Sequence, residues 1–374
     1  MRIALLVPTF EIGGVERVFT NLANGLHQCG AEVDLVVGWA GGEMAKSLER
    51  DIRVFDLCSR RMMKSIPRLA KYLRTRKPEA AIAAMTHCSA AAVAARAISG
   101  QETMIIGTEH NTMSRIRENT AGLKYRLMPR WSRWALDLAD VVVAVSSGVA
   151  DDLSAQTGIA RESIRVIYNP VINNGLYSAA GAEIDHPWFQ PGEPPVILGV
   201  GRLDRQKDFS MLVRAFRIVR DHRVARLVIL GEGPDRSEIE QTIADNGLLG
   251  DVVLPGSEVN PYRFMKHSAL LAMSSRWEGF GMVLVEALAL GVPVVSTNCT
   301  HGPGEILCDG RFGVLVPVGD EKAMAQSLLL ALDDPLRCSD ASHLEKFSTR
   351  VAALSYLSLV AQHRNISLFS AIER

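Results

Sequence analysis

Residues 275–286 read Ser-Arg-Trp-Glu-Gly-Phe-Gly-Met-Val-Leu-Val-Glu. Glu278 stands beside two glycines, and the apolar run that follows them ends in a second acid, Glu286. Glycine lets a backbone approach a ligand closely, and the free N–H groups at the start of a helix favour an anion. The stretch therefore predicts a turn and a helix that bind an anion and, through a carboxylate, a hydroxyl group, as a nucleotide sugar would require.

The same stretch has a simpler interpretation as an ordinary buried helix. Its residues from Met282 to Leu290 are apolar apart from one acid, and Gly291 and Pro293 mark the end of the helix. Glu286 is the exception, because a carboxylate in an apolar helix costs free energy unless it is paired or bound to a ligand. A ligand ribose and an arginine remain open as its partner.

Short apolar runs alternate with helical patterns along the whole chain. Nearly continuous apolar strands are typical of sheets that are covered on both faces, and their alternation with helices indicates parallel, doubly wound sheets. The sequence therefore predicts an α/β fold. Strands are expected at 3–7, 33–37, 80–84, 104–108, 141–145, 196–200, 227–230, 252–254, 270–273 and 294–297.

The length of the chain predicts two domains, because 374 residues are too many for one ordinary core. The stretch 173–195 is rich in Asn, Gly and Pro and lacks periodicity, which predicts a linker. The first domain is expected at 1–175 and the second at 190–351. A helical pattern after Pro335 has no predicted strand beside it.

The composition bounds the class of protein. With 48% hydrophobic and 22% charged residues and a formal net charge of zero, the chain is predicted to be globular and to have no global attraction to nucleic acid. Residues 1–170 carry 22 basic and 17 acidic residues, whereas the remainder carries 19 and 24. The first half is therefore the better candidate for contact with an anionic surface.

Cysteine usage and hydropathy indicate the compartment. Six scattered cysteines without a Cys-x-x-Cys pair argue against a zinc ribbon or a redox motif and fit a reducing cytoplasm. The apolar run near the N-terminus is too short for a signal peptide. No run of about 18 apolar residues is present, so no membrane-spanning helix is expected.

Two motifs in the first half follow predicted strands, where ligands bind in open α/β sheets. Gly13 and Gly14 would admit a phosphate to a helix N-terminus, and a plain turn is the alternative. In the motif Thr108-Glu-His-Asn, His110 could donate to a phosphate or a sugar hydroxyl. A loop-tying or helix-capping role for Glu109 and Asn111 is the other possibility.

Two motifs in the second half also follow predicted strands. Arg202 and Lys207 share one loop, and a guanidinium with an ammonium suits a diphosphate. Ordinary solvated charge is the alternative, but the position after a buried strand favours the diphosphate. Asp208 is expected to cap the helix that begins near Ser210. Gly231-Glu-Gly-Pro234 predicts a tight turn, whose ligand contacts would come from its backbone.

Several patterns are missing from the sequence. A full Gly-x-Gly-x-x-Gly is absent, which argues against a nicotinamide or flavin dinucleotide. There is no Asp-x-Asp, and no His/Cys/Asp cluster has metal-ligand spacing. Neither a metal nor a cofactor is predicted, so Arg202, Lys207 and helix N-termini would have to neutralise a diphosphate.

The first half also carries a basic stretch. Eight basic residues and no acid lie between positions 60 and 77, with apolar residues at helical spacing. This pattern predicts an amphipathic helix that lies on an anionic membrane, or else a solvated outer helix of the α/β layer. Trp131 and Trp134 lie in a second cluster of similar composition, with Arg115, Arg117, Lys124, Arg126, Arg130 and Arg133.

Taken together, these motifs resemble the retaining glycosyltransferases of family four, which have the GT-B fold. The resemblance covers nearly the whole chain and is most specific in residues 278–286 and in Gly291-Val-Pro-Val-Val295. It implies two Rossmann-like domains that face a central cleft, with the last helix, about 352–374, crossing back to the first domain.

The resemblance also implies roles for individual residues. Arg202 and Lys207 would hold the donor diphosphate, Glu286 the ribose, and Gly14 would approach the diphosphate. Glu278 and His110 would lie near the transferred sugar, so the residues expected to carry catalysis are Glu278, His110, Arg202 and Lys207. The nucleotide sugar would further contact Gly231, Gly233, Pro234, Gly279, Phe280, Gly281, Met282 and Val283.

The function implied is metal-independent transfer, with retention, of a hexose or N-acetylhexosamine from a nucleotide sugar. A UDP-sugar is the expected donor, and a polyprenyl-diphosphate-linked glycan in cell-surface polysaccharide biosynthesis is the expected acceptor. The enzyme would be cytoplasmic and would associate with the inner face of the membrane through residues 60–77. Two alternatives stay open, namely transfer to a small soluble sugar phosphate and a non-catalytic nucleotide-sugar-binding protein.

Overall fold

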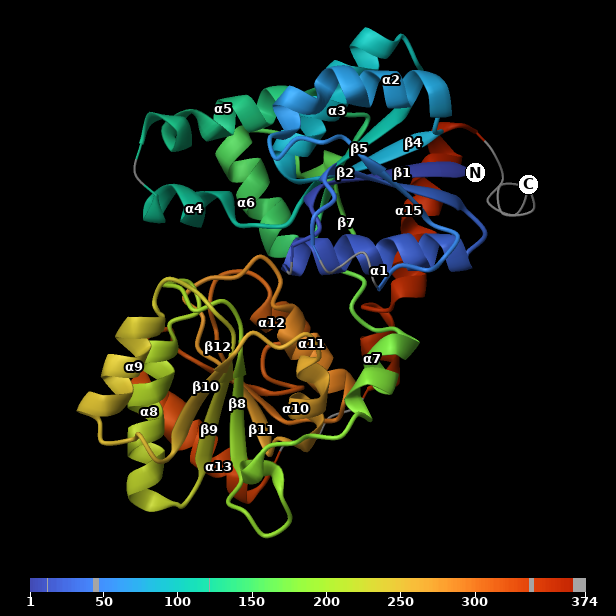
Figure 1. The fold of residues 1–374 in the computed structure, drawn as a ribbon. Helices are drawn as coiled ribbons and strands as arrows, with labels where there is room; N and C mark the ends of the chain where they lie inside the picture. The colour runs from blue at the N-terminus through green and yellow to red at the C-terminus, as the bar shows by residue number, and fades with distance from the viewer. Residues whose placement is uncertain (12, 43–46, 121, 336–339, 366–374) are drawn as a thin grey trace. The chain divides into compact units, whose positions relative to one another are not determined.

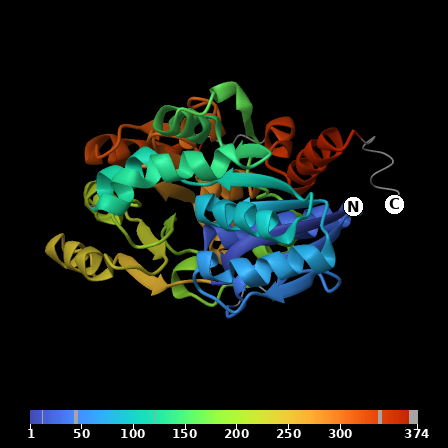
Figure 2. The ribbon, with the colours of Figure 1, turned by 90° about the horizontal axis from the view of Figure 1, so that it is seen from above.

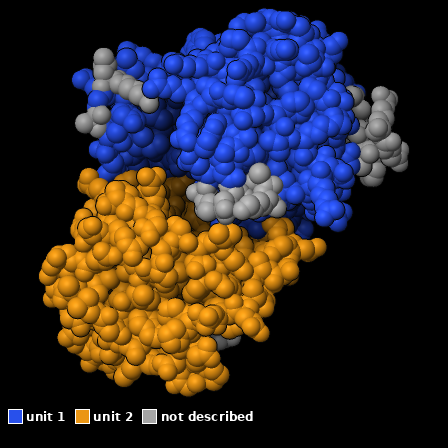
Figure 3. All heavy atoms as spheres, viewed as in Figure 1, with its two compact units in different colours: residues 1–171, 345–374 blue, residues 172–344 orange. Residues whose placement is uncertain are grey.

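A computed structural model describes residues 1–11, 13–42, 47–120, 122–335 and 340–365, with only the backbone of residues 123 and 124 (Figure 1). The chain divides into two compact units, which Figure 3 colours separately. Unit 1 comprises Met1–Val171 together with Glu345–Arg374, and unit 2 comprises Ile172–Leu344. The sequence predicted that the first domain ends at residue 175 and the second begins at 190, with a linker between them. The structure assigns this intervening segment to unit 2.

Unit 1 is built on a seven-stranded parallel sheet with the order β3-β2-β1-β4-β5-β6-β7. Its middle strands are almost wholly buried, because helices cover both faces. The predicted parallel, doubly wound architecture is therefore confirmed in this unit. The strands are β1 Arg2–Thr9, β2 Glu32–Trp39, β3 Arg53–Asp56, β4 Ala80–Ala84, β5 Met104–Glu109, β6 Val141–Ala144 and β7 Ile164–Val166.

Helices α1 and α15 lie on one side of this sheet, and α2, α3 and α5 lie on the other (Figure 1). Each helix packs through an apolar stripe; in α1 the buried residues recur three and four positions apart, as predicted. The helices are α1 Gly14–Gln28, α2 Ile66–Arg76, α3 Met85–Ser99, α4 Met113–Asn119, α5 Leu123–Asp137, α6 Ser147–Thr157 and α15 Thr349–His363, with short 3-10 helices η2 Met62–Ser65 and η3 Arg161–Ser163.

The last helix belongs to unit 1, as predicted. Helix α15 packs against α1, and Gly25 of α1 is so close to Thr349 that a Cβ there would overlap its side chain. The Val171 N–H donates to the Phe347 carbonyl at 2.9 Å, which ties the end of the first segment to the returning one. The predicted helix extends to residue 374, but 366–374 lie outside the described residues.

Unit 2 repeats the architecture with six parallel strands in the order β10-β9-β8-β11-β12-β13. Its strands are β8 Val196–Val200, β9 Arg226–Leu230, β10 Val252–Gly256, β11 Leu270–Met273, β12 Val294–Thr297 and β13 Val314–Val316. Its helices are α7 Asn174–Ala180, η4 Pro187–Phe189, α8 Phe209–His222, α9 Arg236–Asp245, α10 Pro261–His267, α11 Met282–Ala289, α12 Pro303–Ile306, α13 Glu321–Asp333 and α14 Ala341–Glu345.

The structure adds three strands that the sequence did not predict, and all three are edge strands. Strand β3 is largely exposed, with the sequence Arg-Val-Phe-Asp, and β7 and β13 are three residues long. The segment at 173–195, predicted as a linker, contains α7 and η4. Asn173 caps α7, since its side chain accepts a hydrogen bond from the Leu176 N–H.

Candidate functional site

The site in unit 2 lies where the strand order of the sheet reverses. Strands β8 and β11 pair directly, although they are not consecutive in the chain. In open α/β sheets, ligands bind beyond the carboxyl ends of the strands at such a reversal. The loop that carries Arg202 and Lys207 follows β8, and the loop that carries Glu278 follows β11, so the fold brings these two predicted motifs together.

Lys207 and Glu278 form an ion pair, with 2.5 Å between Nζ and Oε1. Their side chains are only 20% and 7% exposed, respectively. The Ser275 hydroxyl donates to the same carboxylate oxygen at 2.6 Å. Burial acts to lower the pKa of Lys207, but the nearby Glu278 carboxylate outweighs it, so the pKa lies above its usual value. The site therefore holds a lysine cation at neutral pH.

Further hydrogen bonds join the two loops. The Gln206 side-chain amide donates to the Trp277 carbonyl at 3.0 Å, and the Arg276 N–H donates to the Gln206 carbonyl at 2.7 Å. The Ser274 hydroxyl donates to the Lys207 carbonyl at 2.7 Å. Ser274, Ser275 and Gln206 were not predicted as site residues, since single polar residues beside a motif give no sequence signal of their own.

Arg202 differs from Lys207 in its surroundings. Its side chain is 72% exposed, and its Nε lies 3.8 Å from the Asp204 carboxylate. An exposed pair at this distance adds little stability. The predicted basic pair thus consists of one buried, fixed ammonium and one guanidinium that is exposed to solvent.

Asp208 does not cap the following helix, so that prediction was wrong. It occupies the position before α8 with a left-handed φ of 49°, and its side chain makes no capping hydrogen bond. The carboxylate instead accepts from Arg276 Nε at 2.7 Å. Asp208 therefore adds another link between the loops after β8 and β11.

The predicted turn at 231–234 supports the first of these loops. The Gly231 N–H donates to the Gly256 carbonyl, and the Leu203 N–H donates to the Glu232 carbonyl at 3.0 Å. A Cβ at Gly231 or Gly233 would overlap the carbonyl of Gly201 or Leu203. Glycine at both positions lets this turn, which Pro234 completes, pack directly on the backbone beside Arg202.

Helix α11 begins at the carboxyl end of β11. Gly281 precedes it with a φ of +95°, a conformation that favours glycine. Phe280 is 3% exposed, and its burial holds the turn against the core. Gly279 precedes it in this turn, and Met282 and Val283 are the first residues of the helix. The first N–H groups of a helix are not used within it, and Glu278 precedes the first residue of α11 by four positions.

Glu286 lies in the middle of α11 and is 3% exposed. The Tyr262 hydroxyl, from α10, donates to its carboxylate at 3.2 Å. The sequence left a ribose or an arginine open as the partner, and it gave no signal that pointed to Tyr262. A carboxylate has two oxygens and can accept several hydrogen bonds, as two vicinal hydroxyl groups would require.

His110 lies in unit 1, directly after β5. It is 8% exposed, and its Nε2 lies 2.9 Å from the Thr108 hydroxyl. That hydroxyl donates to the Ala83 carbonyl at 3.0 Å, so it must accept from His110, which places the proton on Nε2. Nδ1 is then an acceptor, and it has no partner among the described residues. Burial lowers the pKa of His110 to about 4, so the ring is neutral at pH 7.

Glu109 is the neighbour of His110 and is also buried. It accepts a hydrogen bond from the Thr86 hydroxyl at the start of α3. Burial raises its pKa to about 7, although the Thr86 hydrogen bond opposes the shift. Glu109 and His110 therefore favour their neutral forms, so this part of unit 1 offers hydrogen-bonding groups without a fixed charge at slightly acidic pH.

We predict opposite effects of Glu109 and His110 on stability between pH 4.5 and 7. The folded-state pKa of Glu109 is raised from 4.5 to about 7, so its contribution is full below pH 4.5 and is lost as pH rises through 7. The folded-state pKa of His110 is lowered from 6.5 to about 4, so its contribution is full above 6.5 and is lost as pH falls.

Replacing one of the two residues with glutamine removes its contribution to the pH dependence of the free energy of unfolding and leaves the contribution of the other. Relative to wild type, Glu109→Gln should gain about 3 kcal/mol in the free energy of unfolding between pH 4.5 and 8. His110→Gln should lose a similar amount relative to wild type over the same range. Urea unfolding followed by tryptophan fluorescence measures both, and parallel curves for variant and wild type would contradict the prediction.

Gly14, the predicted approach to the diphosphate, is the first residue of α1. Glu16, in the same first turn, places its carboxylate against Gly13 and accepts from the Thr9 hydroxyl at 3.2 Å. Burial raises the pKa of Glu16. The chain's own carboxylate thus lies beside this helix N-terminus, where its charge would disfavour a phosphate.

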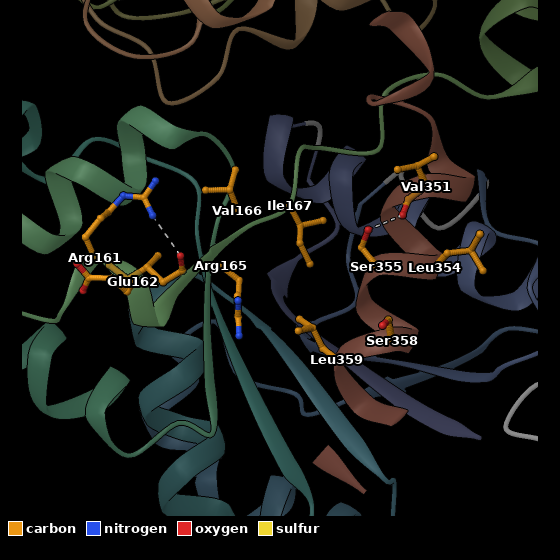
Figure 4. Close-up of a pocket in the computed structure, with 11 residues that line it drawn as sticks. Arg161, Glu162, Arg165, Val166, Ile167, Val351, Leu354, Ser355, Ser358 and Leu359 are labelled. Atoms are coloured by element: carbon orange, nitrogen blue, oxygen red, sulfur yellow. Dashed lines mark hydrogen bonds between the residues drawn. The ribbon is translucent and has the colours of Figure 1, made fainter. Parts of the chain in front are cut away.

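Unit 1 also contains a pocket with a lining of its own (Figure 4). It has a volume of about 750 Å³ and lies between β7 and α15. The Arg161 guanidinium donates to the Ile164 carbonyl at its edge, at 3.3 Å. None of the predicted site residues lines it.

The described residues contain neither a metal-binding cluster nor a helix that could cross a membrane. Among them, no group of three or more His, Cys, Asp or Glu side chains is placed to hold a metal ion. Over the same part of the chain, every helix is too short or too polar to cross a bilayer. The prediction that no metal is needed stays a prediction.

Two family models match the chain. The model described as "Glycosyltransferase Family 4" matches residues 12–172, and the model described as "Glycosyl transferases group 1" matches residues 182–350. The chain belongs to glycosyltransferase family four. Both halves of this family-four glycosyltransferase are thus recognised separately, and the Lys207–Glu278 site falls within the second match.

Individual relatives support the same conclusion. The N-acetylgalactosamine-N,N'-diacetylbacillosaminyl-diphospho-undecaprenol 4-alpha-N-acetylgalactosaminyltransferase of Campylobacter jejuni is 33% identical over 222 residues, which cover 59% of this chain and 58% of that protein. The match thus spans little more than half of that relative. The lipopolysaccharide core biosynthesis glycosyltransferase LpsE of Rhizobium meliloti is 27% identical over 93% of this chain and 96% of its own length.

A solved structure shares the fold of the family-four glycosyltransferase. Anabaena Alr3699/HepE, in complex with UDP and glucose, matches with a TM-score of 0.80 and 19% identity. The match covers 97% of this chain and all of the HepE chain. At this identity the likeness shows the fold alone, which is the GT-B fold with two Rossmann-like domains.

Proposed function

We propose that this family-four glycosyltransferase transfers a hexose or N-acetylhexosamine from a UDP-sugar to a polyprenyl-diphosphate-linked glycan. The observation that carries the proposal is the buried Lys207–Glu278 pair, which lies where the strand order reverses, with Glu278 four residues before the start of α11. A lysine cation, helix N–H groups and carboxylates in one place suit a diphosphate that is joined to hydroxyl-rich groups.

Each part of the donor has candidate residues in unit 2. Lys207, Arg202 and the backbone at 279–283 would neutralise and bind the diphosphate. Glu286 would accept hydrogen bonds from the ribose hydroxyls, and Glu278 would hold Lys207 in place and contact the sugar. The turn at Gly231–Pro234 would support the loop and contact the nucleotide through its backbone.

Catalysis in this proposal rests on positioning and electrostatic stabilisation. The departing diphosphate gains charge, and a fixed ammonium with helix N–H groups stabilises that charge without reorganisation. A diphosphate oxygen would take the proton of the acceptor hydroxyl as that hydroxyl attacks on the same face, which gives retention. No divalent metal is required in this scheme.

His110 would contribute from unit 1. Because its Nδ1 is an acceptor and its ring is neutral, it suits a hydrogen bond from a sugar hydroxyl better than a phosphate contact. Of the two ligand groups that the sequence left open for His110, the geometry favours the hydroxyl.

The acceptor is proposed from the relatives. The Campylobacter jejuni relative is named for an undecaprenol-diphosphate-linked substrate, and the Rhizobium meliloti relative for lipopolysaccharide core biosynthesis. A lipid-linked acceptor implies an enzyme at the cytoplasmic face of the membrane, held there peripherally. The basic residues at 60–77 are the predicted contact with that surface.

The test begins with donor binding. Purified protein is heated with UDP-, GDP- and ADP-sugars, and the UDP-sugar should raise the melting temperature by several degrees at about 100 times its dissociation constant. Transfer is then measured with two acceptors, a short-chain polyprenyl-diphosphate glycan in detergent and a soluble hexose phosphate.

Transfer to the lipid-linked glycan alone supports the proposal. Transfer to the hexose phosphate alone would replace it with the soluble-acceptor alternative. Tight UDP binding without transfer or hydrolysis of any donor in the panel would indicate a binding protein.

A further inference from the structure

The outward side of α5 is apolar, which is unusual for a helix that faces solvent. Leu127, Trp131, Trp134 and Leu138 are 44%, 40%, 49% and 44% exposed. Their spacing of four, three and four positions places them on one side of the helix axis. The opposite side is used for packing, since Ser132, Ala135 and Leu136 are buried.

Arginines flank this apolar stripe along one side. Arg126 and Arg130 form no ion pair among the described residues, whereas Arg133 pairs with Asp137 at 3.2 Å. The sequence has no acid from position 119 to position 136. The exposed stripe is therefore bordered by positive charge that the fold itself does not neutralise.

Further basic residues lie on the same side of the sheet as the stripe. Helix α3 lies between α5 and α2, as Figure 1 and Figure 2 both show, and exposes Ile98 at its end. On α2 and the preceding turn, the basic side chains on the outward side are exposed. The surface formed by α5, Ile98 and the basic residues Lys64, Arg68, Lys71 and Arg74 is called the α2–α5 face below.

The helix at 60–77 cannot lie in a membrane as a free amphipathic helix would. Its apolar residues Met62, Leu69 and Leu73 are buried in the core of unit 1. Arg76 is held within the fold, 3.0 Å from the buried Asp34 and 3.1 Å from Glu32. Helix α2 can therefore supply positive charge to a surface, but its apolar side is not available for insertion.

We propose that the α2–α5 face docks on an anionic lipid bilayer, with the α5 stripe inserted at the interface and the α2 cations over the lipid phosphates. Tryptophan is favoured at the boundary between headgroups and acyl chains. Apolar area and basic charge act together in such binding. The uncompensated charge of this face argues for an anionic lipid surface over an apolar protein partner.

This inference deepens the proposed function, because docking would bring the enzyme to a lipid-linked acceptor. It assigns insertion to α5 and leaves α2 an electrostatic part, whereas the sequence assigned membrane contact chiefly to residues 60–77.

The test is sedimentation of the full chain with vesicles of phosphatidylglycerol and phosphatidylcholine, compared with vesicles of phosphatidylcholine alone. The variant Trp131→Ser/Trp134→Ser should bind the anionic vesicles at least about tenfold more weakly. Lys64→Glu/Lys71→Glu should weaken binding about 30-fold or more at low salt, because each basic residue near the surface is worth about 1 kcal/mol. Raising the salt from about 50 to about 500 mM should weaken binding of the wild type.

A matched control removes exposed apolar side chains from unit 2. Leu249 and Leu330 are 75% and 68% exposed, and Leu249→Ser/Leu330→Ser should bind vesicles as the wild type does. Wild type that ignores anionic vesicles would overturn the inference. So would equal binding by the tryptophan variant, or a change from dimer to monomer in that variant without any effect on vesicle binding.

Transfer in detergent separates the two proposals. The tryptophan variant should transfer sugar to the short-chain acceptor at the wild-type rate, because its substitutions lie in unit 1 and leave the residues of the Lys207 site in unit 2 unchanged. Vesicle binding without transfer to the lipid-linked acceptor would remove the proposed acceptor and leave the docking face. Transfer to the lipid-linked acceptor without vesicle binding would keep the proposed acceptor and overturn the docking face.

Discussion

Replacing Lys207 with methionine should lower the rate of sugar transfer by about 10³-fold, because it removes the buried cation that the proposed mechanism places beside the departing diphosphate. A single preorganised group that stabilises developing charge contributes about 10²- to 10³-fold in rate, and a full ammonium lies at the upper end. Methionine keeps most of the apolar stem, so packing changes little. Release of UDP from a UDP-sugar at saturating acceptor measures the rate.

Stability must be separated from catalysis in this variant. Loss of the lysine leaves the Glu278 carboxylate buried without its cation, and breaking such a pair costs about 3–5 kcal/mol. The double variant Lys207→Met/Glu278→Gln removes both charges and should recover most of this loss. We expect the double variant to melt near the wild-type temperature and still to be about 10³-fold slower.

Lys266→Met serves as the control, since Lys266 lies on α10, and its nearest hydrogen-bond contact is the Leu290 carbonyl at 3.5 Å. It should transfer sugar at the wild-type rate. If the folded double variant worked at a rate close to wild type, Lys207 would have only a structural role and the proposed site would be wrong.

Replacing Glu286 with glutamine should weaken UDP binding about 100-fold. A carboxylate that accepts hydrogen bonds from two ribose hydroxyls is worth about 1.5–3 kcal/mol for each bond, and glutamine presents one neutral acceptor in place of two charged oxygens. Glutamine is nearly the same size and can still accept from the Tyr262 hydroxyl. Titration calorimetry with UDP and with uracil alone measures the effect, which should be absent for uracil.

Tyr262→Phe provides the matched control for Glu286. It removes the hydroxyl that donates to the carboxylate and leaves the carboxylate in place. UDP affinity should fall by less than about tenfold, since one neutral donor is lost. Equal losses in both variants would mean that Glu286 only holds α10 against α11 and does not contact the ribose.

The sequence predicted the fold well because its central strands are buried on both faces. Each of the predicted strands is present, and boundaries such as 80–84, 196–200 and 270–273 agree with the structure. The edge strands β3, β7 and β13 were missed, because they are only three or four residues long and because β3 and β7 contain charged residues. Arg53 and Asp56 of β3 read as surface residues, which they are.

Prediction of the site was less complete, for a different physical reason. Lys207 and Glu278 were found as separate motifs, Lys207 because its loop follows a buried strand and Glu278 because it stands beside two glycines before a helix. Their pairing depends on β8 and β11 being neighbours, which is a property of strand order and leaves no trace at either position. The same holds for Tyr262 beside Glu286.

Predictions from the local sequence also missed side-chain partners that come from distant parts of the chain. Asp208 stands at a helix start, where a side-chain cap is the usual role, but Arg276 draws its carboxylate to the other loop. The sequence showed the basic pattern at 60–77, but it did not show that Arg76 forms ion pairs with Asp34 and Glu32. Composition identifies charged segments, whereas only the structure shows which charges remain free.

The links between the loops after β8 and β11 have a consequence for how such enzymes can diversify. Gln206, Lys207 and Asp208 each form a hydrogen bond or an ion pair with the segment 274–278. The conformation of each loop therefore depends on the other. A chimaera that takes one loop from a relative and keeps the other would lose these matched contacts. New sugar preferences should therefore be inherited with both loops exchanged as a pair.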